Sequence, residues 1–198
     1  MCGIAGVYSL DQARAAAALK AMVSAQVPRG PDDGGSMILP LRDACLGLGH
    51  RRLAILDLSA AGHQPMIHPG TGDILIFNGE IYNFRGLRAD LQKAGTRFEG
   101  SGDTEVLLHA LSTWGSDCIP RLQGMFAFAF YSRRTRRLLL ARDPLGIKPL
   151  YTARTRDGFI FASEVRALLA SGLITPDIDR GALASFLAYV AIQPPAAL

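Results

Sequence analysis

The first side chain able to do covalent chemistry is Cys2, which directly follows Met1. Its small size favours removal of Met1, after which Cys2 would carry both a thiol and a free α-amine. The reference pKa of such an amine is about 7.7–8.0 and that of a thiol about 8.5, so the amine can accept the thiol proton near neutral pH. The residue would then be a nucleophile with its own base. The alternative is a small apolar residue at the start of a buried strand, and the position alone favours that alternative.

A second candidate is Asn78-Gly79, which follows an apolar run at residues 74–77. An Asn side-chain N–H and the next backbone N–H can point the same way and hold an oxyanion. The same dipeptide is the strongest short signal for a hairpin turn. Taken alone, it favours the turn.

Two opposite charges, Arg52 and Asp103, could together hold a zwitterion such as a free amino acid. A guanidinium can bind a carboxylate through two parallel hydrogen bonds. Asp103 follows Gly-Ser-Gly at the expected start of a helix, where its carboxylate could receive an ammonium group. The alternatives are a solvated arginine and a helix N-cap, although a capping carboxylate keeps lone pairs for a second partner.

The other reactive side chains show no comparable pattern. The histidines lack the spacing of a metal site, and we interpret them as structural: His50, His63, His68 and His109. Several arginines between residues 133 and 137 fall in an expected hairpin turn, which favours a solvated loop over a phosphate clamp. The cysteines, Cys2, Cys45 and Cys118, are odd in number and have no metal-like spacing. They argue against a disulfide framework or zinc site and favour a reducing cytoplasm.

Composition restricts the class of protein further. The chain has 198 residues, 49% of them hydrophobic and 19% charged, which fits one large or two small globular domains rather than a disordered chain. Its formal net charge of +4 is small and spread along the sequence, so nucleic acid is not an expected partner. No apolar run approaches the roughly 18–20 residues of a membrane helix, and no secretory signal is visible.

Periodicity predicts the elements that must position these residues. Helices are expected over residues 12–26, 84–94, 103–114, 164–170 and 180–188. Strands are expected over residues 4–8, 37–39, 44–49, 53–56, 74–77, 125–131, 137–142, 150–153 and 159–162. Strands outnumber helices and many are joined by hairpins. This predicts an α+β fold of antiparallel sheets with helices on their outer faces.

The ordered set of motifs is far more specific than any one of them. They are MCGIAG at 1–6, RGPD at 29–32, GHRRL at 49–53, NGEIYN at 78–83, SGDTE at 101–105, GMFAF at 124–128 and RDPLGIKPLY at 142–151. This set resembles the class II glutamine amidotransferase domain, an N-terminal-nucleophile hydrolase. Within that class it is most similar to the N-terminal half of glutamine-hydrolysing asparagine synthetases, and the resemblance covers nearly the whole chain.

The resemblance implies a four-layer α-β-β-α sandwich with two antiparallel sheets. It also implies hydrolysis of L-glutamine to L-glutamate and ammonia, with Cys2 as the catalytic nucleophile and Asn78 and Gly79 as the oxyanion hole. The family's substrate-binding positions match Arg52 for the α-carboxylate, Asp103 for the α-ammonium, and Leu53, Ala54, Ile55, Leu56 and Glu80 around them.

The family passes its ammonia through a channel to a C-terminal synthetase domain. We therefore expect a type 2 amidotransferase domain at residues 1–178 and the start of a junction at residues 179–198. ATP and Mg²⁺ would belong to the synthetase domain, and no cofactor or metal is expected within this chain. The expected partners are L-glutamine, a synthetase domain or subunit that receives ammonia, and a second copy in a homodimer.

Two alternatives remain open. The chain could serve an amidotransferase with another acceptor, although such relatives usually show tryptophan or tyrosine after the pocket arginine, where this chain has Leu53. It could also be a non-catalytic docking domain, against which the intact site residues argue. Two positions depart from the family pattern: Pro28 stands where members usually carry histidine, and Gly102 separates Ser101 from Asp103.

Overall fold

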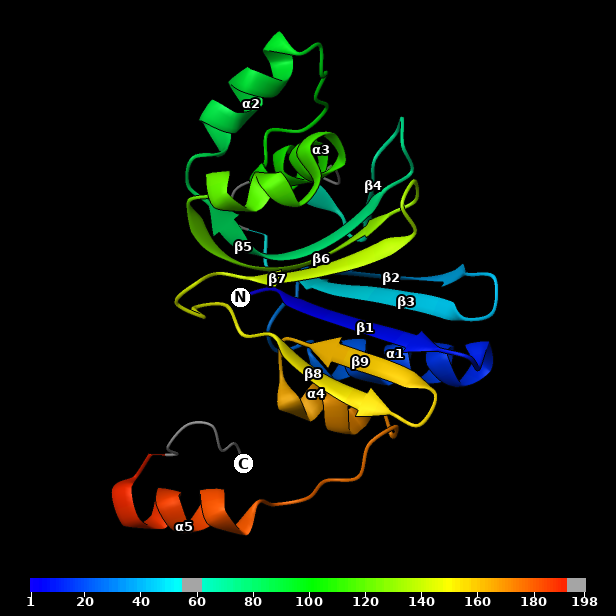
Figure 1. The fold of residues 1–198 in the computed structure, drawn as a ribbon, viewed down its shortest axis with the longest axis vertical. Coiled ribbons are helices and arrows are strands. Elements are labelled where there is room, and N and C mark those ends of the chain that lie inside the picture. The colour runs from blue at the N-terminus through cyan, green and yellow to red at the C-terminus, as the bar shows by residue number, and fades with distance from the viewer. Residues whose placement is uncertain (55–61, 192–198) are drawn as a thin grey trace.

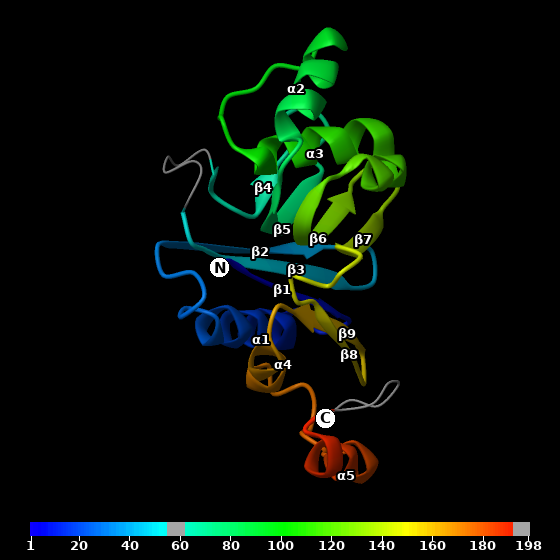
Figure 2. The same cartoon turned by 90° about the vertical axis from the view of Figure 1, so that its left-hand side faces the viewer.

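Two antiparallel sheets stack face to face in the computed structural model of the chain, which describes residues 1–54 and 62–191. Helices cover the outer face of each sheet, so the layers run helix, sheet, sheet, helix (Figures 1 and 2). The expected α-β-β-α sandwich is therefore confirmed. Within the described ranges, no helix has both the length and the apolar character needed to cross a membrane.

The first sheet has the strand order β2-β3-β1-β9-β8. Its strands are β1 (Gly3–Ser9), β2 (Asp33–Pro40), β3 (Cys45–Arg52), β8 (Tyr151–Thr155) and β9 (Gly158–Ala162). Central β1 pairs with β3 on one side and with β9, from the far end of the chain, on the other. Helices α1 (Gln12–Ala25) and α4 (Val165–Ala170) pack on the outer face (Figure 1).

The second sheet has the strand order β4-β5-β6-β7. Its strands are β4 (Met66–Ile67), β5 (Ile74–Ile81), β6 (Gly124–Ser132) and β7 (Arg137–Arg142). The helices α2 (Phe84–Lys93) and α3 (Asp103–Trp114) cover it, and a 3₁₀ segment at Gly115–Arg121 leads into β6. Helix α5 (Arg180–Tyr189) lies apart from the sandwich, at the bottom of Figure 1.

The alternation of β6 shows how the sequence divides the core. Phe126, Phe128 and Phe130 pack on the side of α2 and α3. Ala127 and Ala129 face the other way, into the layer between the sheets. Side chains of a strand alternate between its faces, so one strand fills two layers. Small alanines at these positions leave room for the facing sheet, and β5 contacts both β1 and β3.

Most predicted elements are confirmed, and helix α3 has the predicted bounds. Asp11 caps α1 as expected, accepting a hydrogen bond from the Arg14 N–H at 3.0 Å. The strand predicted over residues 53–56 is not found at Leu53 and Ala54, because β3 ends at Arg52; residues 55 and 56 lie outside the described ranges. Strands β2 and β5 are longer than predicted.

Candidate active site

A pocket of about 330 Å³ opens where β1, β3 and β5 end near one another. It brings together the predicted nucleophile, oxyanion and substrate-binding positions that the structure describes, apart from Ala54. The predicted residues that line it are Cys2, Arg52, Leu53, Asn78, Gly79, Glu80 and Asp103. Ile55 and Leu56 lie outside the described residues. Residues more than a hundred positions apart thus share one cavity.

Cys2 is held at the start of β1 by contacts on both its side chain and its backbone. The Leu53 N–H points at the Cys2 Sγ at 3.4 Å, and the thiol is 3.6 Å from the Leu53 carbonyl oxygen. Arg29 Nε donates to the Cys2 carbonyl at 2.9 Å and pairs with Glu164 at 3.3 Å. The half-buried Cys2 is therefore placed as a nucleophile facing the pocket.

Met1 also lines the pocket, and it is 57% exposed. While Met1 is attached, the Cys2 nitrogen belongs to a peptide bond and cannot act as a base. Removal of Met1 would free the α-amine beside the thiol without disturbing a buried side chain.

Asn78 and Gly79 lie inside β5, not in the hairpin turn that the dipeptide alone favours. The N–H groups of Phe77 and Ile81 point away from the paired strand β6. The Phe77 N–H donates to Gln64 Oε1 at 2.6 Å, and the Ile81 N–H donates to Asp103 Oδ2 at 2.9 Å. These tertiary contacts, together with pairing to β6 as far as Ile81, extend the strand through the dipeptide.

The Gly79 N–H must share this edge, because alternate residues of an antiparallel strand direct their N–H groups to the same side. It therefore points toward the pocket that Gly79 lines. Asn78 is 1% exposed, and its Nδ2 has no hydrogen-bond partner among the described residues. A buried donor without a partner is costly unless a ligand satisfies it. The arrangement fits two donors for an oxyanion.

Position 79 requires glycine because the backbone of β6 approaches it closely. A Cβ there would lie 2.4 Å from the Met125 carbonyl oxygen and 2.8 Å from the Phe126 Cα. Both atoms belong to the backbone of β6, so they cannot rotate away. The strand pairing that aims the donors therefore depends on the absence of a side chain.

The opposite charges lie on different walls of the pocket. Arg52 ends β3, is 9% exposed, and rests against Gly62, where a Cβ would be 2.1 Å from a guanidinium nitrogen. The next residues are tied to the loop after α1. The Ala54 N–H donates to Asp32 Oδ2 at 2.8 Å, and the Asp32 N–H donates to the Arg52 carbonyl at 3.1 Å. Ala54 is thus beside the pocket rather than in its lining.

Asp103 is the first residue of α3, and Gly102 is the N-cap, so the expected cap is displaced by one residue. Burial raises the pKa of the Asp103 carboxyl, and the neighbouring Glu80 charge raises it further. The hydrogen bonds from Ile81 and from the N–H groups at the start of α3 oppose that rise in pKa. Burial and the Glu80 charge both destabilise the ionised carboxylate, so a nearby cation such as an α-ammonium group would stabilise it.

Neither family departure removes a site residue. Pro28 is exposed and does not line the pocket. Gly102 does line it, with an extended backbone that begins α3 and leaves Asp103 directed at β5.

Sequence reasoning did not assign Gln64, Met125 or Lys148, which also line the pocket. Gln64 carries no local signal, because it reaches the pocket from a segment outside the sheets, whereas Met125 lies within the GMFAF motif. Lys148 lies within the RDPLGIKPLY motif, which was the available signal. It is 8% exposed, and its N–H donates to Asp143 Oδ2 at 3.0 Å.

Comparison with known proteins agrees with this geometry. The chain belongs to the glutamine amidotransferase domain family, whose model matches residues 1–198. It is 38% identical over 191 residues to asparagine synthetase [glutamine-hydrolyzing] 3 of Bacillus subtilis (strain 168), covering 92% of this chain and 30% of that protein. It is 36% identical over 202 residues to asparagine synthetase [glutamine-hydrolyzing] 1 of the same organism, covering all of this chain and 31% of the relative. The chain thus spans less than a third of these relatives.

Solved structures confirm the fold. Glutamine phosphoribosylpyrophosphate amidotransferase from B. subtilis, complexed with ADP and GMP, matches with a TM-score of 0.67 at 21% identity, covering 91% of this chain and 46% of that one. A structure described as the allosteric regulatory enzyme of purine biosynthesis matches with a TM-score of 0.70 at 22% identity and the same coverage.

Proposed function

We propose that this chain hydrolyses the side-chain amide of L-glutamine to give L-glutamate and ammonia. The observation that carries the proposal is the buried Asn78 Nδ2, which has no hydrogen-bond partner in the described part of the chain and lies beside Gly79 in the same pocket as Cys2. Two donors near a thiol are suited to an acyl transfer that passes through a tetrahedral oxyanion. The Arg52 and Asp103 side chains in the same pocket suit the α-carboxylate and α-ammonium of a free amino acid.

The reaction follows from these positions. The Cys2 thiolate, whose proton the free α-amine accepts, adds to the amide carbon of the substrate and forms a C–S bond. Asn78 and Gly79 hold the oxygen that becomes negative. When the tetrahedral intermediate collapses, the C–N bond breaks, and the α-ammonium of Cys2 protonates the leaving ammonia. Water then attacks the glutamyl thioester with the amine as base, which releases glutamate and the thiol.

A direct test compares cysteine variants of the chain after the mass of its mature N-terminus is verified. Cys2→Ala should lower glutamine turnover by at least about 10⁴-fold, because the covalent route is lost. Its thermal transition should remain near that of the wild type. Release of ammonia and glutamate from glutamine measures turnover, and substantial hydrolysis by Cys2→Ala would overturn the assignment.

The other two cysteines provide matched controls. Burial raises the pKa of Cys118 to about 11 and also raises the pKa of Cys45. Neither thiol should react readily with iodoacetamide at neutral pH, and turnover by Cys45→Ala and Cys118→Ala should stay close to normal. Labelling of the native chain should stop at one equivalent, located on Cys2 by peptide mass. Inactive protein that retains Met1 would identify its removal as the missing step.

We further propose that the ammonia serves a glutamine-hydrolysing asparagine synthetase, in which a larger synthetase part amidates aspartate with ATP. The names of the two B. subtilis relatives support this acceptor. ATP and Mg²⁺ would belong to that part, and the hydrolysis described above has no step that uses them. Addition of a separately produced synthetase part, with asparagine as the readout, tests the acceptor.

The same proposal places the amidotransferase domain at residues 1–178 and a junction from residue 179 onward. Support comes from exposed apolar side chains near that junction, on the loop before β8 and on α5; they include Leu145, Ile147, Leu187 and Val190. A homodimer through this face is proposed for the chain by itself. We also propose a cytoplasmic location, supported by three cysteines that are all free.

A further inference from the structure

Phe77, the residue before the oxyanion donors, is held through its backbone N–H and its carbonyl by side chains from two other parts of the chain. The Phe77 N–H donates to Gln64 Oε1 at 2.6 Å, and the Phe77 carbonyl lies 3.0 Å from His50 Nε2. All three residues are buried, with exposures of 1% for His50, 2% for Phe77 and 3% for Gln64. The Phe77 carbonyl belongs to the peptide group that joins Phe77 to Asn78, so a rotation of that group would also turn the Asn78 and Gly79 donors.

The histidine contact is directional. A carbonyl oxygen can only accept, so His50 Nε2 must carry the proton in this hydrogen bond. Burial lowers the pKa of His50 to about 3, which keeps the ring neutral and leaves Nδ1 without a proton. Nδ1 is buried and has no partner among the described residues. A buried acceptor without a partner costs stability, so packing in the core does not by itself account for a histidine at this position. The Nε2–H donor directed at the Phe77 carbonyl does account for it.

The His50 bond also joins the two sheets at the level of the site. His50 is on β3 of the first sheet, where its register partner is Ile4 of β1, two residues from Cys2. Phe77 is on β5 of the second sheet. The hydrophobic side chains packed between the sheets make contacts without a preferred direction, whereas this hydrogen bond is directional. The bond therefore helps to fix the position of the oxyanion donors relative to the nucleophile.

Gln64 holds the N–H of the same residue, Phe77, which belongs to the preceding peptide group. Its carbonyl packs against β2 at Gly35, where a Cβ would lie 2.3 Å from that oxygen. Its backbone thus rests on the first sheet while its side chain holds the second. The N–H and the carbonyl of Phe77 are consequently both fixed with respect to the sheet that carries Cys2.

We propose that His50 and Gln64 are positioning residues of the oxyanion site: by holding the two peptide groups on either side of the Phe77 Cα, they keep the Asn78 amide and the Gly79 N–H aimed at the reacting carbonyl oxygen. This inference rests on the proposed glutamine hydrolysis. It predicts that both side chains act on the transition state through β5, and that His50, which is not in the pocket lining, affects neither substrate binding nor the thiol.

Steady-state kinetics with glutamine provide the first test. His50→Leu should lower kcat by about 10²-fold, the loss typical of a misplacement near 1 Å, with little change in KM. His50→Gln keeps an N–H donor near the Nε2 position and should recover kcat to within several-fold of the wild type. Gln64→Leu, on a segment outside the sheets, should repeat the kcat loss and keeps the test decisive if His50→Leu does not fold.

An aldehyde analogue of glutamine, glutamate γ-semialdehyde, gives a readout that general destabilisation would not move. The Cys2 thiol adds to its carbonyl, forming a C–S bond and a tetrahedral oxygen that occupies the oxyanion site. His50→Leu should bind this aldehyde about 10²-fold more weakly than the wild type does, as the same misplaced donors require. Inhibition by L-glutamate and the rate of Cys2 alkylation by iodoacetamide should stay unchanged.

Leu48→Ala is the matched control, because Leu48 lies on the same face of β3 as His50 and packs between the sheets, but has no polar group to hydrogen-bond to Phe77. It should lower the thermal midpoint while keeping kcat. If His50→Leu and Leu48→Ala lose equal kcat, or if His50→Leu weakens glutamate and aldehyde equally, the positioning role is overturned. Wild-type turnover tests the proposed function separately: an inactive wild type with a free Cys2 amine overturns both, whereas an active wild type leaves the variant ratios to decide.

Discussion

Arg52 and Asn78 would act at different moments of the reaction, so their variants should separate binding from catalysis. The Arg52 contact with a carboxylate exists in both ground and transition states, and Arg52→Ala should mainly raise KM. A rise of about 10- to 100-fold corresponds to the roughly 1.5–3 kcal/mol of a hydrogen bond to a charged group. Asn78→Ala should instead lower kcat by about 10²–10³-fold, because its donor meets charge that develops only during reaction.

Steady-state measurements of ammonia release distinguish the two patterns. Arg134→Ala, at an exposed position in the hairpin after β6, is the control for loss of a positive charge and should change neither constant. An exchange of the two patterns between Arg52→Ala and Asn78→Ala would contradict the division into binding and oxyanion roles.

The raised pKa of Asp103 predicts how substrate binding depends on pH. A protonated carboxyl cannot pair with an ammonium group, so KM for glutamine should rise as pH falls through this raised pKa. Glu80→Gln removes one cause of the elevation and should move the rise in KM to lower pH. Asp103→Asn should give a high KM that no longer depends on pH in this range. An unchanged acidic limb in Asp103→Asn would assign the titration to another group.

The raised pKa of Asp103 also predicts how the stability of the unliganded chain depends on pH. A carboxyl with a higher pKa in the folded than in the unfolded chain favours the folded state when protonated, so stability falls as pH rises from the unfolded to the folded value. Above that window the ionised Asp103 destabilises the chain without substrate. Asp103→Asn should therefore keep or raise Tm at neutral pH while weakening binding. Thermal scans at neutral and acidic pH measure this difference, which should vanish at acidic pH; a clearly lower Tm at neutral pH would contradict it.

At the scale of elements, strand β5 carries the oxyanion site, and Gly79 decides whether it can pair with β6. Gly79→Ala places a Cβ against backbone atoms, so it should destabilise the fold by about 1–3 kcal/mol and lower kcat as the donors shift. Gly86 in α2 is the matched control, since a Cβ there meets nothing within 4 Å. Gly86→Ala should stabilise by roughly 0.5–1 kcal/mol with normal kcat. Denaturant unfolding and kinetics of both variants check the contrast, and equal kcat in the two would remove the geometric argument.

Local sequence pattern predicts the elements whose packing partners are near in the sequence. It does not predict the structure where a partner distant in the sequence determines the conformation. Helix α3 and the β6–β7 hairpin follow from their own periodicity. Asn78-Gly79 favours a turn by itself, yet it extends a strand because Ile81 donates to Asp103 and β6 continues beside it. His50 was interpreted as structural for the same reason: its partner, the Phe77 carbonyl, is on the other sheet.

For the whole molecule, the number of strands and hairpins predicts antiparallel sheets, but the sequence pattern does not predict the order of the strands within them. The first sheet closes by pairing β1 with β9, which are about 150 residues apart in the chain. No short-range signal specifies such a pair, and the resemblance to a family supplied the layered architecture instead. It also supplied the set of site residues, since Cys2 or Asp103 taken alone favours an ordinary structural role.

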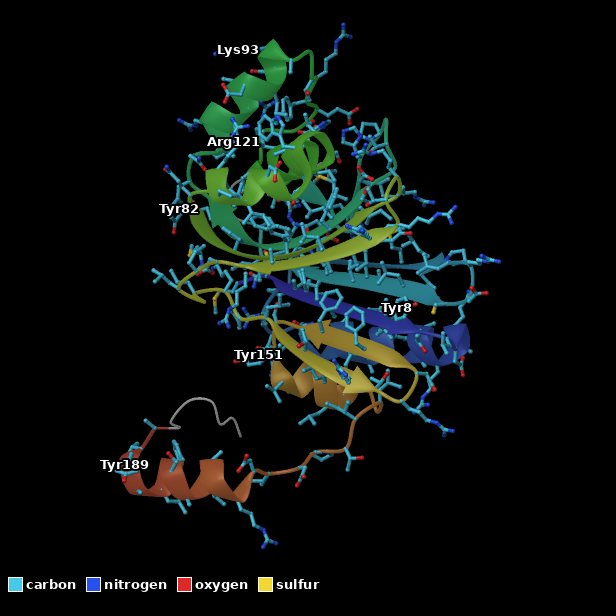
Figure 3. All side chains as sticks on the ribbon, in the orientation of Figure 1. Tyr8, Tyr82, Lys93, Arg121, Tyr151 and Tyr189 are labelled. Atoms are coloured by element: carbon cyan, nitrogen blue, oxygen red, sulfur yellow. The ribbon has the colours of Figure 1, made fainter. Side chains whose placement is uncertain are left out.

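An apolar surface near the end of the described chain bears on assembly. Leu187, Tyr189 and Val190 at the end of α5 are 70–81% exposed, and Leu145 before β8 is 86% exposed. Figure 3 labels Tyr189 on α5 and Tyr151 at the start of β8, on the same side of the view. Large apolar side chains this exposed favour an interaction with another surface. In the proposed full-length protein the synthetase part would cover it.

The chain by itself should consequently associate as its concentration rises, because burial of these side chains removes apolar surface from water. Leu187→Glu places a charge on the face and should shift the chain toward monomer in sedimentation velocity. Ala89→Glu adds the same charge at an exposed position of α2, at the opposite end of the molecule in Figure 1, and should leave association unchanged. If the wild-type chain stays monomeric at every concentration, or if Leu187→Glu associates as the wild type does, this face does not drive association.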